Sequence, residues 1–77
     1  MAFKENLLKL IAKVKIDNGE IKDPALDSVI EILMTLEDVS DLKREKGLIV
    51  RIIIDSVENI NIGEDILVFM NNYTKNR

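Results

Sequence analysis

The stretch that decides the fold is GLIVRIIIDSV at residues 47–57, where six Leu, Ile and Val residues are interrupted only by Arg51. A short run of β-branched residues is typical of a strand, and the glycine before it would mark its start. Side chains alternate between the two faces of a strand, so Arg51 would share a face with Ile49 and Ile53. A strand at 48–54 therefore either buries a charge or exposes two isoleucines.

The same stretch fits a helix better. At 3.6 residues per turn, its charged side chains fall into one narrow stripe with spacings of seven, four and three residues. The stripe consists of Arg44, Arg51, Asp55 and Glu58. We therefore predict a helix over about residues 40–60, with Ser40 as its N-cap and a break at Gly47 left open. The strand at 48–54 stays as an alternative and would make the fold α+β.

Three further helices are predicted on either side of this one. Apolar residues recur at three- and four-residue spacing in residues 2–16 and 24–38, and Asp23-Pro24 is a typical helix start. The pattern returns in residues 63–74, after a break at 61–63. Because short connections make neighbouring helices antiparallel, we predict an all-α, small four-helix bundle-like domain.

Asn18-Gly19 allows a second alternative. In the helical interpretation Gly19 closes the first helix, because glycine readily adopts the left-handed conformation found at helix ends. The same dipeptide is also the strongest short signal for a β-hairpin, here at 14–22. We favour the helix because the helical periodicity runs up to the dipeptide, and keep the hairpin as another α+β alternative.

The length of 77 residues predicts a single domain over 1–77, with a frayed polar tail at 75–77. Only three residues are aromatic, so the core has to be built from 12 Ile, 9 Leu and 6 Val. A domain this small buries only about 60% of the surface that its unfolded chain exposes. Without cysteine it has no disulfides, so we expect its stability to come from packing or from self-association.

Several classes of function are disfavoured by the composition. The chain has no histidine and no cysteine, which supply the commonest general base, the thiolate nucleophile and most transition-metal ligands. The segment around Asn18-Gly19 fails as a calcium loop, because aligning Gly19 puts Val14 and Ile16 at ligand positions. We therefore expect no enzyme, no catalytic or metal site and no cofactor. We also expect a cytoplasmic protein without membrane insertion, because lysines interrupt the N-terminal apolar residues and no long apolar run exists.

Nucleic-acid binding has one candidate cluster, formed by Lys43, Arg44 and Lys46 at the start of the helix over 40–60. Most of that helix is aliphatic and cannot face a DNA groove, and the chain is acidic and poor in aromatic residues. We therefore predict no nucleic-acid partner.

Charge is distributed unevenly. Residues 16–41 carry eight carboxylates against one lysine, whereas residues 1–15 and 42–51 each have a net charge of +3. Such asymmetry can steer a charged partner. We predict an acidic partner face formed by Asp27, Glu31, Asp38 and Asp41.

The helix over 40–60 has more aliphatic surface than three short helices can cover. We expect the surplus to bury itself in a homodimer or partner interface formed by Leu48, Ile49, Ile52 and Ile53. A symmetric dimer would bury it in one self-complementary patch. The function predicted from these features is a non-enzymatic protein–protein interaction module of the adaptor, inhibitor or immunity type.

One family resemblance suggests an alternative function. Asp27-Ser28-Val29 followed by IEILMTLED is similar to the start of the second helix of acyl carrier proteins, and NIGEDILVFMNNY resembles their last helix. The resemblance implies that Ser28 carries 4'-phosphopantetheine and that the acidic second helix is read by partner enzymes.

Overall fold

The computed structural model describes residues 2–75, which form four α-helices. These are α1 (Ala2–Ile21), α2 (Pro24–Met34), α3 (Val39–Asp55) and α4 (Ile60–Thr74). The all-α, four-helix bundle-like prediction is confirmed. Residues 2–75 contain no strand, so the strand at 48–54 and the hairpin at 14–22 are wrong. Residues 48–54 and 14–21 lie inside helices, where one apolar stripe per helix satisfies the burial that a strand would otherwise require.

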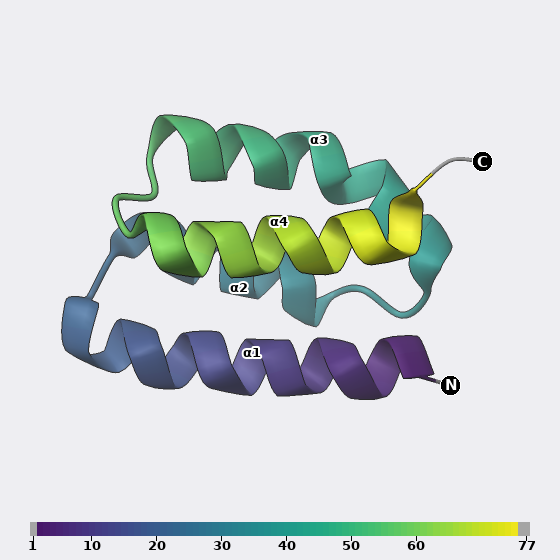
Figure 1. The fold of residues 1–77 in the computed structure, drawn as a ribbon, viewed down its shortest axis with the longest axis horizontal. Helices are drawn as coiled ribbons and strands as arrows, with labels where there is room; N and C mark the ends of the chain where they lie inside the picture. The colour runs from purple at the N-terminus through teal and green to yellow at the C-terminus, as the bar shows by residue number, and fades with distance from the viewer. Residues whose placement is uncertain (1, 76–77) are drawn as a thin grey trace.

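The helices form a closed cycle in which α1 packs on α2, α2 on α3, α3 on α4 and α4 on α1 (Figure 1). In the view of Figure 1, α4 lies in front of α2, while α3 and α1 lie at the top and the bottom. The buried hydrophobic side chains come from all four helices and from Leu36 between α2 and α3. They are Phe3, Leu7, Ile11, Val14, Leu26, Val29, Ile30, Leu33, Leu36, Leu42, Ile49, Ile53, Ile62, Ile66 and Met70.

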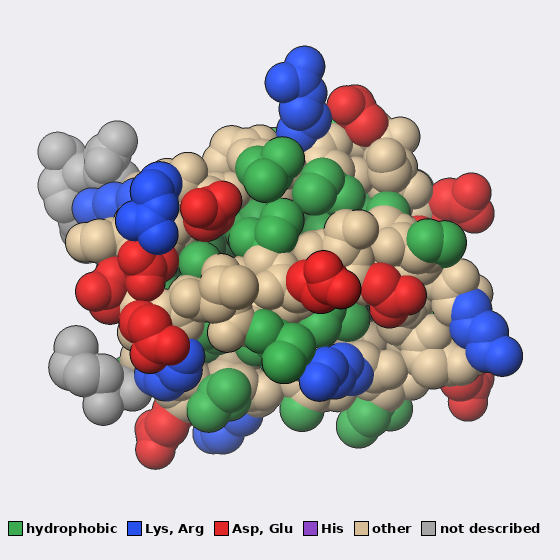
Figure 2. Space-filling view, turned by 180° about the vertical axis from the view of Figure 1, so that it is seen from behind, with side chains coloured by type: hydrophobic (Ala, Val, Ile, Leu, Met, Phe, Trp, Pro, Cys, Tyr) green, Lys and Arg blue, Asp and Glu red, His purple; other side chains and the backbone are tan. Residues whose placement is uncertain are grey.

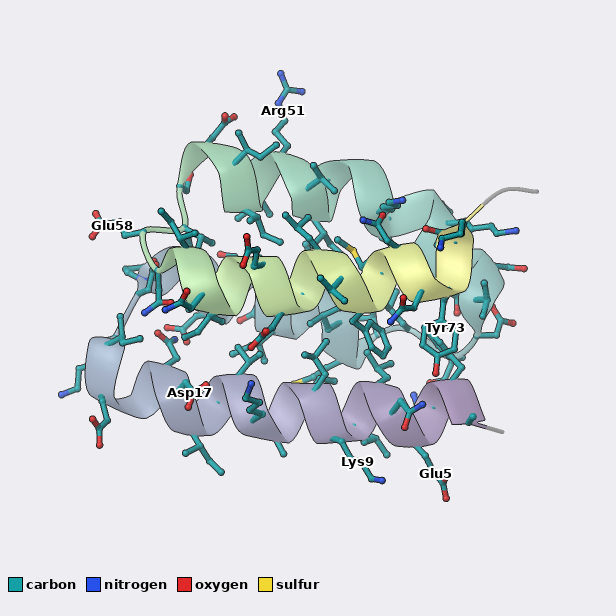
Figure 3. All side chains as sticks on the ribbon, in the orientation of Figure 1. Glu5, Lys9, Asp17, Arg51, Glu58 and Tyr73 are labelled. Carbon is teal, nitrogen blue, oxygen red and sulfur yellow. The ribbon has the colours of Figure 1, made fainter. Side chains whose placement is uncertain are left out.

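Aromatic side chains join α1 to α4 where the N-terminal end of α1 meets the C-terminal end of α4. The ring centroids of Phe3 and Tyr73 are 5.1 Å apart in an edge-on arrangement, and Phe69 packs against both. The phenol oxygen of Tyr73, labelled in Figure 3, accepts a hydrogen bond from Asn6 Nδ2 at 2.7 Å. These contacts hold together the first and last helices of the chain.

The first helix runs five residues further than predicted and ends at Ile21. Gly19 is helical and does not close the helix; instead Lys22 adopts the left-handed conformation, with φ of 57°. The Lys22 N–H donates to the Asn18 carbonyl at 2.7 Å. Asn18 is buried, and its side chain accepts from the Asp23 N–H and donates to the Asp23 carbonyl. Because the Asn18 amide is bound in this way, the helix continues through the residues that resembled a turn.

Asp23 caps α2, as the sequence predicted, and also connects two loops. Its Oδ1 accepts from the Ala25 N–H at 3.0 Å, which satisfies a free donor at the start of α2. Its Oδ2 accepts from the Glu58 N–H at 2.9 Å. The buried carboxylate of Asp23 therefore fastens the α3–α4 connection to the start of α2.

The boundary between the second and third helices differs from the prediction. Helix α2 ends at Met34, four residues before the predicted end, and α3 begins at Val39. The N-cap of α3 is Asp38 and not Ser40, because Asp38 and Asp41 form a reciprocal capping box. Leu36 is buried between the helices although it belongs to neither of them.

Glycine residues also gave wrong predictions for the third and fourth helices. Helix α3 passes through Gly47 without a break and ends at Asp55, five residues before the predicted end. Helix α4 begins at Ile60, three residues before the predicted start, because Asn59 is its N-cap and accepts from the Ile62 N–H at 2.9 Å. Gly63 lies inside α4 and is buried. It allows close packing on α3 and does not break the helix.

Of the predicted tail at 75–77, Lys75 follows α4 and is exposed, whereas residues 76 and 77 lie outside the described residues. Over residues 2–75, none of the helices combines the length and the apolar character that crossing a membrane requires.

Candidate interaction surface

The predicted interface quartet on α3 is divided between the core and the surface. Ile49 and Ile53 are buried in the core of the chain itself, with 0% and 8% exposure. They share an inward stripe with Leu42, and side chains at such spacing lie on the same helix face. The prediction that Ile49 and Ile53 face a partner is therefore wrong. Leu48 is half exposed and Ile52 is half-buried, so only these two residues of the quartet reach the surface.

Ile54 lies beside α4, and helix geometry puts Leu48 and Ile52 on the other flank of α3, toward its second neighbour α2. Figure 2 shows this side of the molecule, where hydrophobic side chains gather over α3 and carboxylates over α2. Ile32 of α2 is half-buried against the core. We call Leu48, Ile52 and Ile32 the α2–α3 patch.

The four acidic residues predicted as a partner face do not act alike. Asp27 and Glu31 are exposed on α2, and Asp27 accepts a hydrogen bond from Asn18 Nδ2 at 2.9 Å. Together with Lys15 they line a hollow of about 440 Å³ between α1 and α2. Asp38 and Asp41 instead hold the start of α3. Of these four residues, only Asp27 and Glu31 have carboxylates that do not cap a helix.

Asp41 has three hydrogen-bond donors around its carboxylate. Its Oδ2 accepts from the Glu37 N–H at 2.9 Å and from the Asp38 N–H at 3.4 Å, and its Oδ1 accepts from Arg44 Nη2 at 2.9 Å. The Glu37 N–H is the largest influence and the Arg44 guanidinium the next, and together they lower the pKa of Asp41 below its ordinary value of 3.8. Asp41 thus stabilises the α2–α3 connection in its ionised form.

Ser28 is exposed on α2, so its hydroxyl is accessible. It lies one turn inside the helix, next to Asp27 and one turn before Glu31. The structure thus places Ser28 inside α2 and not in the connection before it.

An apolar hollow lies between α3 and α4, and the sequence did not predict it. It measures about 320 Å³, and we call it the α3–α4 groove. Its lining is Ile53, Ile54, Val57, Asn59, Ile60, Gly63, Glu64 and Leu67. Ile54 is 71% exposed and Ile60 is 76% exposed, so two isoleucines stand at its edge facing solvent.

The floor of the groove depends on Gly63. A Cβ atom at this position would lie 3.0 Å from Ile53 Cγ2 and 3.8 Å from Val57 Cγ1. The absence of a side chain therefore lets α4 approach the end of α3 closely. Val57 and Leu67 are half-buried and complete the apolar surface.

Charge along the seam between α3 and α4 changes sign from one end to the other. At the far end from the interhelix loop, Lys46 Nζ donates to Thr74 Oγ1 at 2.8 Å, which places the start of α3 against the end of α4. Lys43 and Lys75 are exposed at this end. At the loop end Glu64 lines the groove and Glu58 is exposed on the loop, where Figure 3 labels it. The seam is thus basic at one end, and the apolar groove shares the other end with Glu58 and Glu64.

Other hollows carry more charge. The hollow between α1 and α4, about 620 Å³, includes Lys13 and Asp65, whose side chains form an ion pair at 2.8 Å. The hollow at the end of α1 includes Asp17 and Glu20. Among the described residues, no group of three or more carboxylates is arranged to hold a metal ion. The α3–α4 groove is therefore the best candidate for contact with another apolar surface.

A sequence signal for this groove exists in the three consecutive isoleucines at 52–54. Consecutive helix residues are separated by about 100°, so three neighbours cannot all face one core. Ile53 takes the inward position, and Ile52 and Ile54 fall on opposite flanks, toward α2 and α4. The predicted interface combined the inward residues Ile49 and Ile53 with the first flank and did not include Ile54.

No known family, curated protein or solved structure matches this chain. The similarity of Asp27-Ser28-Val29 to acyl carrier proteins therefore rests on the quoted residues alone.

Proposed function

We propose that this chain is a non-enzymatic protein–protein interaction module of the adaptor, inhibitor or immunity type, which binds another protein surface through the α3–α4 groove. The observation that carries the proposal is the pair of isoleucines at its edge. Ile54 and Ile60 are more than two-thirds exposed, and the hollow between them is lined mainly by aliphatic side chains. Exposed apolar clusters rimmed by polar residues are typical of protein interaction sites.

The negative charge of α2 also supports the proposal, because it can attract a basic partner. Asp27 and Glu31 are exposed on α2, in the most acidic part of the chain. Carboxylates outside a contact surface raise the rate of association with a basic partner more than they raise the affinity. We expect the association rate to fall as salt is added, and a rate independent of salt would exclude these two residues from the mechanism.

The proposal is tested by photo-crosslinking in living cells. A photoreactive amino acid replaces Ile60 at the groove, and the same amino acid replaces Ile16 in the control. Ile16 is 74% exposed on α1, so the two positions match in residue type and exposure. We expect crosslinked protein species from position 60. These species should not appear when the photoreactive amino acid is at position 16. Equal crosslinking at both positions, or none at position 60, would contradict the proposal.

The carrier alternative makes a different prediction. A carrier needs a covalent arm on Ser28, so the intact mass of the protein from its own host would exceed that of the bare chain. We expect the unmodified mass, because Ser28 lies one turn inside a helix that already begins at Pro24. A phosphopantetheine adduct that disappears in Ser28→Ala would replace our proposal with the carrier function.

A further inference from the structure

We propose that the α3–α4 groove binds a basic amphipathic helix of another protein, which inserts aliphatic side chains into the groove and sets lysine or arginine against Glu58 and Glu64. This inference rests on the proposed function, because it assigns the chemistry of the partner at the same surface. It is carried by the position of the two glutamates beside the apolar hollow. Glu64 is part of the lining, and Glu58 stands in the chain between Val57 and Asn59, which are part of it as well.

The segment that forms the groove is acidic throughout. All lining residues fall within residues 52–74, which contain four carboxylates and no lysine or arginine. The neighbouring Arg51 pairs with Asp55 at 3.9 Å and points away from α4 in Figure 3. Glu58 and Glu64 are exposed, and neither takes part in an ion pair in the described part of the chain. The two glutamates therefore leave uncompensated negative charge beside an apolar surface.

This charge decides which kind of apolar surface fits the groove. A partner that enters the hollow brings the side chains that flank its own apolar residues next to Glu58 and Glu64. Lysine or arginine is attracted there, whereas the phosphates of nucleic acid or anionic lipid are repelled. A second copy of this chain, related by a two-fold axis through the groove, would set the two glutamates against their own counterparts. The charge therefore favours a basic protein segment over a second copy.

The secondary structure of the groove favours a helix as the partner segment. Helices α3 and α4 bond their own backbone groups, so the groove offers no open sheet edge to which a partner strand could add. A helix instead presents aliphatic side chains at i, i+3, i+4 and i+7 to an apolar hollow. With a volume of about 320 Å³, the hollow holds only a few such side chains. Basic residues on the flanks of this apolar stripe then lie beside the glutamates.

Three synthetic helical peptides test the inference by fluorescence anisotropy with the purified chain. All have leucine at i, i+3, i+4 and i+7, and they differ only on the flanks of this stripe, which carry lysine, glutamine or glutamate. We expect the affinity to decrease in that order, by roughly tenfold or more between the lysine and the glutamate peptide. Equal affinities, or no binding of the lysine peptide up to millimolar concentration, would overturn the inference.

Charge reversal in the chain tests whether the two glutamates set this order. Glu58→Lys with Glu64→Lys should make the glutamate peptide bind more tightly than the lysine peptide. The matched control, Glu5→Lys with Glu20→Lys, makes the same change of charge on α1 and should keep the order of the parent chain. All four glutamates are exposed, so neither double variant alters the core, and circular dichroism checks the fold. A lysine preference that survives the reversal at 58 and 64 would overturn the assignment to this groove.

A neutral substitution tests the apolar part of the contact separately from its charge. Ile60→Ser removes exposed aliphatic surface at the edge of the groove without changing the charge. It should weaken the binding of all three peptides and leave their order unchanged. Unchanged affinities would show that the peptides bind outside the groove, which would overturn the inference.

The inference and the proposed function fail in different ways. If the lysine peptide does not bind but position 60 still crosslinks to another protein in cells, the proposed function stands and the partner has a different chemistry. A crosslinked species of twice the mass of the chain, together with a dimer in sedimentation equilibrium that Ile60→Ser dissociates, would make a second copy the occupant and overturn the basic helix. Failure of the lysine peptide without crosslinks at position 60 overturns both hypotheses.

Discussion

Gly63 of α4 and Ile53 of α3 lie so close that a single carbon atom fills the space between them. A Cβ at Gly63 would stand 3.0 Å from Ile53 Cγ2, which is tighter than ordinary van der Waals contact. Gly47 of α3 is also helical, yet a Cβ there would meet nothing within 4 Å. The two glycines thus occupy similar backbone conformations in opposite surroundings.

We predict that Gly47→Ala raises the free energy of unfolding by about 0.5–1 kcal/mol, since alanine is the better helix former and its methyl group has open space. Gly63→Ala gains the same propensity but has to displace Ile53, so it should be less stable than Gly47→Ala. Gly63→Leu should destabilise the chain clearly, because overpacking a filled contact costs about 1–3 kcal/mol. Urea unfolding of the three variants measures the difference. Equal stabilisation by the two alanines would show that α3 and α4 are not in close contact at Gly63.

Lys22 provides a second prediction, because it holds a conformation that suits glycine. Its φ of 57° lies in the left-handed region, which costs an L-residue with a side chain roughly 1–2 kcal/mol. Lys22→Gly removes this strain. It also increases the entropy of the unfolded chain, which lowers the stability by about 0.4–1 kcal/mol. We expect a net stabilisation of roughly 0.5 kcal/mol in thermal or urea unfolding. Lys22→Ala is the control, because alanine bears the same strain and should give no such gain.

Asp41 gives a prediction about pH. The Glu37 N–H and Arg44 lower its pKa in the folded state, so its carboxylate stabilises the fold above the unfolded pKa near 3.8. This stabilisation is lost as the pH falls through the lower, folded value. We therefore expect Asp41→Asn to melt at a lower temperature than the parent at pH 7. The two melting temperatures should converge as the pH falls below 3.8. A difference that stays constant over this range would mean that the charge of Asp41 contributes nothing.

The sequence predicted the number and order of the helices because apolar periodicity depends on the whole length of a segment. It predicted the ends less well, since several residues have two local roles. Asn18-Gly19 is a strong turn signal, yet the Asn18 amide is held by Asp23 and the helix continues. Ser40 and Asp38 are both good N-caps, and the position of Asp41 three residues after Asp38 decided between them.

The interface residues were harder to predict for a related reason. Periodicity shows that α3 has an apolar face, but not which flank its neighbours leave uncovered. The buried Ile49 and Ile53 are aliphatic residues like the exposed Leu48 and Ile54, so residue type does not tell the two pairs apart. Only the packing of α2 and α4 decides which pair is buried. The contact of Gly63 with Ile53, which shapes the groove, joins residues ten positions apart in sequence and leaves no local pattern.

Leu48 and Ile49 give the last prediction, because they are adjacent on α3 and differ completely in burial. Leu48 is 50% exposed, whereas Ile49 is fully buried. Ile49→Asp places an unpaired charge in the core and should abolish cooperative folding, as judged by circular dichroism and urea unfolding. Leu48→Asp should leave the helical signal unchanged and cost little stability. It should also leave the crosslinks from position 60 unchanged, because Leu48 lies toward α2 and away from the α3–α4 groove. A folded Leu48→Asp chain that loses those crosslinks would instead place the partner contact on the α2–α3 patch.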